Sequence, residues 1–137
     1  MKPEFTQASE SFKRANPQIF GPAGEGIATR EIPAGPSKFE IKEKKTLQQQ
    51  IVDHLERNGI IVIKSRTDKK TTTAVGIPDL LFAVKGRAIA FEVKLPGKNP
   101  TEEQADMMRL MSRNGWLCLV IHSYDEAVEN FRKINID

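Results

Sequence analysis

The chain has 137 residues and a mass of 15.4 kDa, which fits one domain of ordinary size. No stretch approaches the roughly 18 consecutive apolar residues of a membrane-spanning helix, and the first residues lack the apolar centre of a secretory signal. With only one cysteine, Cys118, an internal disulfide is excluded, so we expect a cytoplasmic protein. The net charge of +3 and the pI near 9.1 permit a polyanionic partner without requiring one.

Residues 1–36 are rich in proline and show no sustained apolar periodicity. Five of the eight prolines lie there: Pro3, Pro17, Pro22, Pro33 and Pro36. This composition predicts a flexible N-terminal arm, followed by one folded domain over residues 37–137. The alternative is that three apolar residues of the arm dock on the core or on a partner subunit: Phe12, Ile19 and Phe20.

The first long helix has two competing starts. Residues 37–40 and 46–49 both fit the capping-box spacing, in which a Ser or Thr and a Glu or Gln satisfy free N–H groups. Apolar residues recur at helical spacing from Leu47 to Leu55, and Gly59 supplies a stop. A helix over about 46–58 is therefore predicted, with an earlier start at Ser37 left open.

The remaining pattern predicts four strands and two more helices. The β-branched run 60–63 suits a strand buried on both faces, and residues 64–75 read as a polar, basic loop. Runs 78–84 and 88–95 flank Lys85-Gly86 and predict a hairpin. A helix opening at Thr101, a strand over 116–121 and a helix capped by Ser123 complete the order αβββαβα. This order predicts an α/β fold in which helices flank a mixed four-stranded sheet.

Three charged residues in the hairpin are candidates for chemistry. Side chains alternate along a strand, so Glu92 and Lys94 share a face, and the hairpin brings Asp79 alongside them. Two neighbouring carboxylates repel each other unless a cation joins them, and Mg²⁺ prefers such oxygen ligands. The backbone carbonyl of Val93 is a candidate third ligand. An ammonium beside the metal can orient or deprotonate water, so this set indicates phosphodiester hydrolysis.

The same residues resemble a known family. Residues 76–82 (GIPDLLF), residues 91–94 (FEVK) and Gln104 in the next helix resemble the VRR-NUC branch of the PD-(D/E)XK nuclease superfamily, over about residues 43–133. The resemblance implies a restriction-endonuclease-like core, dependence on Mg²⁺ or Mn²⁺, and DNA as substrate. It also implies that Asp79 and Glu92 are metal ligands, that Lys94 is the catalytic lysine and that Gln104 is an active-site residue.

The first helix departs from the family pattern. Members of this branch carry a glutamate in that helix, but the corresponding spacing before Leu47-Gln48 leads to Lys44. Glu43 lies one residue away and is our candidate for the acidic role, with Glu40 and Gln48 as alternatives.

Basic residues indicate where DNA would bind. Four of them precede the GIPD motif within seven positions: Lys64, Arg66, Lys69 and Lys70. Such residues contact phosphates without reading sequence. Lys98, together with the free N–H groups of the helix that follows it, is a second candidate phosphate contact.

These observations predict a Mg²⁺-dependent DNA endonuclease that selects branched DNA, such as a Holliday junction, rather than a base sequence. Cutting two strands of a junction favours a homodimer. Small members of this branch resemble phage or prophage proteins of DNA recombination and repair, and no small-molecule cofactor is expected. The alternative is a non-catalytic DNA-binding or interaction module that keeps the nuclease fold.

Overall fold

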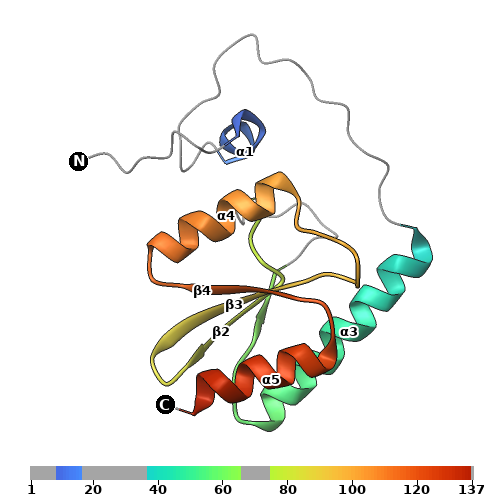
Figure 1. Cartoon of the computed structure of the whole chain (residues 1–137), viewed down its shortest axis with the longest axis vertical. Helices are drawn as coiled ribbons and strands as arrows, with labels where there is room; N and C mark the ends of the chain where they lie inside the picture. Colours follow the sequence, from blue (N-terminus) through green and yellow to red (C-terminus); the bar gives the residue numbers. More distant parts are fainter. Residues whose placement is uncertain (1–8, 17–36, 66–74, 137) are drawn as a thin grey trace.

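The computed structural model describes residues 9–16, 37–65 and 75–136, in which three helices and four strands form an α/β core and one short helix precedes them (Figure 1). The helices are α1 (Glu10–Ala15), α3 (Lys38–Arg57), α4 (Glu102–Arg113) and α5 (Tyr124–Asn135). The strands are β1 (Ile63–Lys64), β2 (Leu80–Val84), β3 (Arg87–Val93) and β4 (Leu117–Ile121). The sheet order is β1-β2-β3-β4, with β3 and β4 parallel and the other pairs antiparallel. The predicted mixed four-stranded sheet is therefore confirmed.

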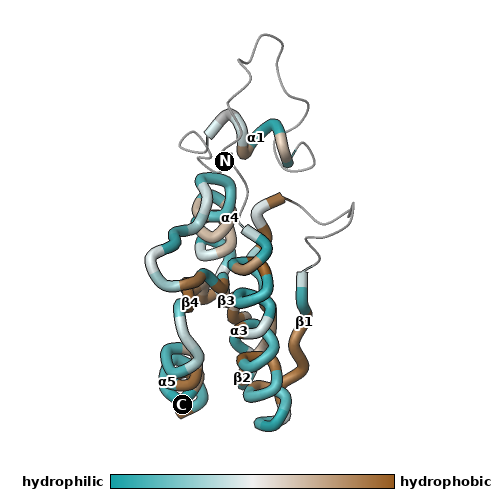
Figure 2. Tube along the Cα trace, turned by 90° about the vertical axis from the view of Figure 1, so that its right-hand side faces the viewer, coloured by the Kyte–Doolittle hydropathy of each residue, from teal (hydrophilic) through white to brown (hydrophobic). Residues whose placement is uncertain are grey.

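Helices cover both faces of the sheet. On one face, α3 and α5 bury apolar residues against the strands, among them Leu55, Phe91 and Phe131. On the other face, Met107 and Met111 of α4 pack over Ala90. Figure 2 shows hydrophobic strand segments between helices whose outer sides are hydrophilic. None of the helices in the described ranges combines the length and apolarity needed to cross a bilayer.

The β2–β3 hairpin sets the position of the acidic residues. Lys85 and Gly86 both have positive φ, 50° and 81°, as a two-residue hairpin turn with the twist of the flanking strands requires. The turn fixes a register in which Leu80 lies opposite Phe91. Asp79, one residue before β2, is thereby brought to the level of Glu92.

The longer of the two possible starts of α3 is the one adopted. The Ser37 side chain accepts a hydrogen bond from the Glu40 N–H at 3.2 Å, so the helix begins about two and a half turns before the apolar stripe that starts at Leu47. At the other end the Asn58 and Gly59 N–H groups donate to the last carbonyls, and Gly59 has φ 80°.

The prediction for residues 60–63 was wrong in part. Only Ile63 and Lys64 form β1, and the side chains of Ile61 and Ile63 are 85% and 62% exposed. Ile60 and Val62 do pack on the core, so one face of the segment is buried and the other is not. This exposure arises because β1 is an edge strand of the sheet, and Figure 2 shows that no helix covers its outer side.

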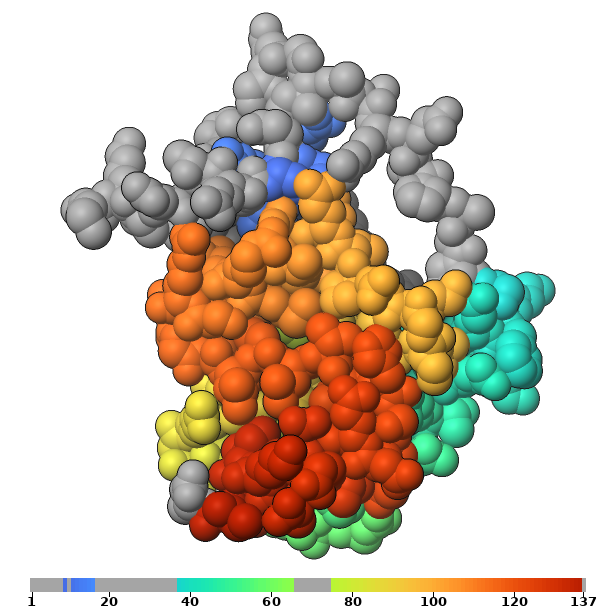
Figure 3. All heavy atoms as spheres, viewed as in Figure 1, coloured from blue at the N-terminus to red at the C-terminus, as the bar shows by residue number. Residues whose placement is uncertain are grey.

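The prediction of a flexible arm does not hold for residues 9–16. Ser9 caps α1 through the Phe12 N–H, and its own N–H donates to the buried Asp106 carboxylate at 3.0 Å. Phe12 is 1% exposed and packs beside the α4 methionines, so for this residue the alternative, docking on the core, is what the structure has. Figure 3 shows α1 lying against α4. Ile19 and Phe20 lie outside the described residues.

Candidate active site

Two carboxyl groups are buried together where the hairpin meets the start of α4. Asp79 is 5% exposed and Glu92, at the carboxyl end of β3, is fully buried. They lie on the face covered by α4, because Glu92 follows the alternation of Ala90 while Phe91 and Val93 face α3 and α5. The sequence pattern predicted this juxtaposition, and the structure has it.

Asp79 takes the place of a strand partner. Its Oδ2 accepts a hydrogen bond from the Val93 N–H at 2.9 Å, at the point where β2 has not yet begun and cannot supply a carbonyl. The backbone carbonyl of a strand residue points to the same edge as its N–H, so the Val93 carbonyl is directed toward Asp79 as well. Asp79 thus connects the start of one strand to the end of the next.

Glu92 has an unusual environment for a carboxyl group. Burial, then a hydrogen bond with Asp79 and the charge of Asp79, raise the pKa of Glu92 to about 9. Such a bond between two carboxyl groups requires that one of them keep its proton. When both are ionised, Glu92 Oε2 is buried without any donor. The pair therefore needs either a proton or a cation.

Lys94 lies beside the pair. Its Nζ is 3.9 Å from Glu92 Oε1, and its side chain is 15% exposed. Burial and the nearby charge of Lys44 lower the pKa of Lys94 below that of an ordinary lysine, although the two carboxyl groups oppose the shift. The predicted convergence of two carboxylates and this amine is present.

Gln104 links the site to the start of α4. Its Oε1 accepts from the Thr101 N–H at 2.9 Å, and Thr101 Oγ1 accepts from the Gln104 N–H, which completes the predicted capping box. Its Nε2 also donates to Glu92 Oε1, at 3.4 Å. One side chain therefore caps the helix and contacts the acidic pair.

The first helix contributes a lysine where we expected an acid. Lys44 Nζ lies 3.2 Å from Asp79 Oδ2 and 3.8 Å from Glu92 Oε1. Glu43 is exposed and does not join the cluster, and Glu40 instead pairs with Lys98 Nζ at 3.7 Å. The signal for Lys44 was present in the sequence, since it continues the helical stripe of Leu47, Ile51 and Leu55 by one turn.

The candidate DNA contacts are only partly described. Lys64 is exposed on β1, and the Lys98 side chain is 57% exposed before α4. Arg66, Lys69 and Lys70 lie outside the described residues.

The donor set fits a divalent cation held by few protein ligands. Within the described ranges, no three His, Cys, Asp or Glu side chains gather as a metal cluster. Asp79, Glu92 and the Val93 carbonyl offer three oxygen-bearing ligand groups. Glu92 Oε2, which has no hydrogen-bond partner, is the atom that a cation would satisfy. Mg²⁺ commonly binds through one or two carboxylates and keeps several waters, which agrees with this sparse set.

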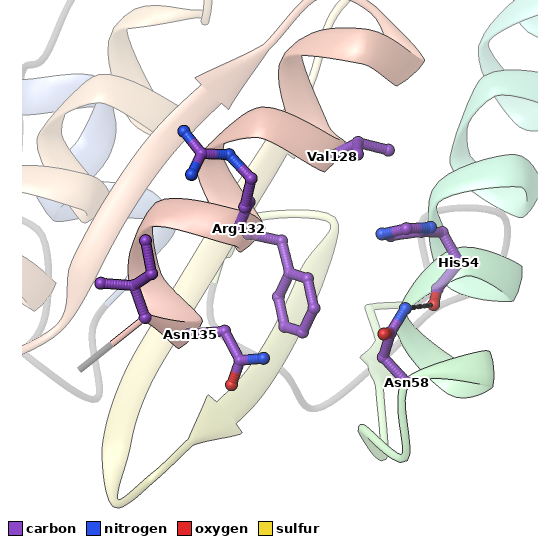
Figure 4. Close-up of a pocket in the computed structure, with 7 residues that line it drawn as sticks. His54, Asn58, Val128, Arg132 and Asn135 are labelled. Atoms are coloured by element: carbon purple, nitrogen blue, oxygen red, sulfur yellow. Dashed lines mark hydrogen bonds between the residues drawn. The ribbon is translucent and has the colours of Figure 1, made fainter.

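A hollow lies between α3 and α5 (Figure 4), and none of the residues that line it belongs to the acidic cluster. It has a volume of about 330 Å³ and is lined by seven residues: His54, Asn58, Val128, Phe131, Arg132, Asn135 and Ile136. The His54 ring packs edge-on against Phe131, with 5.9 Å between the ring centroids. The His54 backbone carbonyl accepts a hydrogen bond from Asn58 Nδ2 at 2.8 Å. The ring contact joins α3 to α5, and the residues that line the hollow include no acidic pair.

Comparison with known proteins supports the fold. No protein-family model matches this sequence, and no curated protein does. A solved VRR_NUC domain is similar in structure, with a TM-score of 0.55 and 21% sequence identity, over 66% of this chain and 95% of that one. This chain therefore has the fold of a VRR_NUC domain, with the acidic pair, Lys94 and Gln104 grouped at one end of its sheet.

Proposed function

We propose that this protein is a Mg²⁺- or Mn²⁺-dependent DNA endonuclease that hydrolyses phosphodiester bonds. The observation that carries the proposal is the buried Asp79–Glu92 pair with Lys94 Nζ 3.9 Å from Glu92 Oε1, on a VRR_NUC fold. Structural scaffolds rarely retain two adjacent buried acids without a cation, because each desolvated charge is unfavourable.

We assign metal binding and water orientation to different residues of the site. Asp79, Glu92 and the Val93 carbonyl would hold the cation, which supplies charge neutralisation to the phosphodiester when bound. Gln104 keeps Glu92 oriented through its Nε2 contact. Lys94, whose pKa is lowered by burial and by the charge of Lys44, orients the attacking water for in-line displacement. By analogy with the resembled nucleases, the products carry a 3′-hydroxyl and a 5′-phosphate.

The DNA is bound through its backbone. Lys64 and Lys98, with Arg66, Lys69 and Lys70, would contact phosphates, which gives affinity without base recognition. Selection of branched DNA such as a Holliday junction, a homodimer with paired sites, and a role in phage recombination or repair belong to the same proposal. Glu43, which is exposed, would act only after a change in α3, so we assign it no direct role.

A second candidate is a non-catalytic DNA-binding module. The position of Lys44 favours it, because an ammonium 3.2 Å from Asp79 Oδ2 provides the acidic pair with a permanent counter-charge. In that case the fold would bind DNA, and no cation would be required.

A cleavage panel tests the two. Purified protein is incubated with a four-way junction, single-stranded DNA and linear duplex, in Mg²⁺, Mn²⁺ or EDTA, beside the Asp79→Asn variant as control. We expect metal-dependent cleavage of the junction by the wild type and none by the variant. DNA binding without cleavage in any metal would reject the endonuclease in favour of the module, and equal cleavage by Asp79→Asn would indicate a contaminating nuclease.

A further inference from the structure

Lys44 stands where a cation is needed. Its Nζ lies within 4 Å of both carboxyl groups of the pair, at 3.2 Å from Asp79 Oδ2 and 3.8 Å from Glu92 Oε1. Lys94 approaches only Glu92, at 3.9 Å, so Lys44 is the lysine that bridges the two acids. Within the described core, the Val93 N–H donates a hydrogen bond to Asp79 and Gln104 Nε2 donates one to Glu92.

We propose that Lys44 is an internal competitor of the divalent cation: its ammonium occupies the cation position between Asp79 and Glu92 and must withdraw when the metal binds. The inference rests on the metal site of the proposed function. It assigns to Lys44 the control of how tightly that site binds metal.

The charge balance supports this role. With both carboxyl groups ionised, Lys44 and Lys94 bring the four-group cluster to neutrality, so an arriving dication gains no net attraction until Lys44 leaves. An acid at the same helical position would instead give a cluster of net charge −2. The single substitution of an acid by Lys44 therefore changes the electrostatic energy of a dication strongly at separations near 4 Å.

The geometry permits withdrawal. The Lys44 side chain is 28% exposed, whereas those of Asp79 and Glu92 are 6% and 0% exposed, so the lysine reaches inward from the surface over fixed acids. A lysine stem is flexible and its ammonium is strongly hydrated, so its return to solvent requires no rearrangement of the backbone. The carboxyl groups, held by the Val93 N–H and Gln104, stay in place.

Metal affinity in the absence of DNA tests the inference directly. Free Mn²⁺ is measured by electron paramagnetic resonance during titration of the full chain, for the wild type, Lys44→Met, Lys44→Arg and Lys44→Glu. Lys45→Met is the matched control, because Lys45 is the exposed neighbour with the same charge. We expect the Mn²⁺ dissociation constant to fall by at least about tenfold in Lys44→Met and further in Lys44→Glu. Lys44→Arg and Lys45→Met should stay near the wild type.

The alternative role of Lys44, structural support of the acids, makes the opposite prediction. Weaker or unchanged Mn²⁺ binding in Lys44→Met, in a variant whose circular dichroism matches the wild type, overturns the inference. Lys44→Gln, which removes the charge without adding a carboxylate ligand, provides the same decision if Lys44→Met does not fold.

The test separates this inference from the endonuclease itself. Mn²⁺ binding that tightens in Lys44→Met while no variant cleaves DNA upholds the competitor role and rejects the catalytic function. If cleavage depends on Asp79 but the Mn²⁺ affinity is the same with and without Lys44, the catalytic function is upheld and the competitor role is rejected. Absence of Mn²⁺ binding in every variant rejects the metal site and the inference with it.

Discussion

At the scale of single residues, the buried carboxyl groups that would bind the metal lower the stability of the metal-free fold. Glu92 is fully buried, and its Oε2 has no donor when the group is ionised. An unsatisfied buried charged group destabilises a fold by more than the roughly 1–3 kcal/mol of a neutral one. The protein tolerates this because Lys44 and Lys94 lie within 4 Å of Glu92 Oε1.

Replacing Glu92 by glutamine tests this balance. We expect Glu92→Gln to be more stable than the wild type by about 1–3 kcal/mol in EDTA at neutral pH. The raised pKa makes the folded wild type hold a proton that its unfolded state releases, and a neutral amide avoids that cost. Added Mg²⁺ should stabilise the wild type and leave the variant unchanged. Urea unfolding with and without Mg²⁺ measures both effects. A variant that is less stable than the wild type in EDTA would mean that the carboxylate supports the metal-free fold.

We expect Lys94 to contribute to the cleavage step rather than to the affinity for DNA. We expect Lys94→Ala to lower the cleavage rate by about two orders of magnitude or more, as loss of a positioned proton-transfer group does. DNA binding should change little, because the Lys94 side chain is largely buried, whereas the candidate phosphate contacts Lys64 and Lys98 are exposed. Single-turnover cleavage and fluorescence anisotropy separate the two readouts. Unchanged cleavage would remove Lys94 from the mechanism.

At the scale of elements, the GIPD segment depends on close contact with α4. Gly76 has φ 91°, and a Cβ there would lie 2.6 Å from the Glu103 carbonyl oxygen. Pro78 and Asp79, which follow, are buried, so a shift at Gly76 would move the acid. Backbone of one element therefore fits directly against backbone of another.

Gly76→Ala should be destabilising beyond the usual penalty for a positive φ. Gly97 is the matched control, because its φ is 82° but a Cβ there would meet nothing within 4 Å. We expect Gly97→Ala to lose about 1 kcal/mol, and Gly76→Ala to lose about 2 kcal/mol more through the clash. Urea unfolding of both variants gives the difference. Equal losses would show that the loop adjusts around the methyl group.

Helix α1 docks against α4, and Phe12 is the largest side chain that it buries. Phe12 is 1% exposed, whereas Phe39 at the start of α3 is 67% exposed and serves as control. We expect Phe12→Ala to destabilise the docked helix by about 3 kcal/mol, and Phe39→Ala to have almost no effect. Hydrogen exchange of the α1 amides measures docking locally. Unchanged protection in Phe12→Ala would place the attachment elsewhere, for instance in the Ser9–Asp106 bond.

The elements that could be predicted from the sequence are those with local signals. The β2–β3 hairpin followed from its turn residues, and the register then placed Asp79 near Glu92. The capping box of α4 identified Gln104, but not its contact with Glu92, because that depends on how α4 crosses the sheet. Lys44 was missed although its helical phase was readable, because a lysine was not expected to point toward a core.

At the scale of the whole molecule, the mixed four-stranded sheet was predictable, and the strands at its edges were not. Strand alternation gives the faces of β2 and β3, but it does not tell which strand lies outermost, so the exposure of Ile61 was unforeseen. The docking of α1 likewise depends on contacts with α4, more than 90 positions along the chain, as in the bond between Ser9 and Asp106. Such long-range contacts leave no local pattern in composition.

The distribution of charge over the whole molecule makes a prediction about DNA affinity. The net charge of +3 is small, so binding should depend on the few basic residues that meet phosphates rather than on an overall attraction. Neutralising Lys69 and Lys70 together should reduce the slope of log affinity against log salt concentration by about 2, and should weaken junction and duplex binding alike.

Fluorescence anisotropy in a series of NaCl concentrations measures that slope, with Lys85→Ala and Lys133→Ala as a control of equal charge. Both control residues are exposed and lie at the end of the molecule formed by the β2–β3 turn and α5, where the Lys85 ammonium donates to the Asn135 carbonyl. We expect the control to keep the wild-type slope, because its lysines lie away from the acidic pair. An equal loss of slope in both double variants would mean that DNA responds to total charge, and the basic segment before GIPD would lose its assigned role.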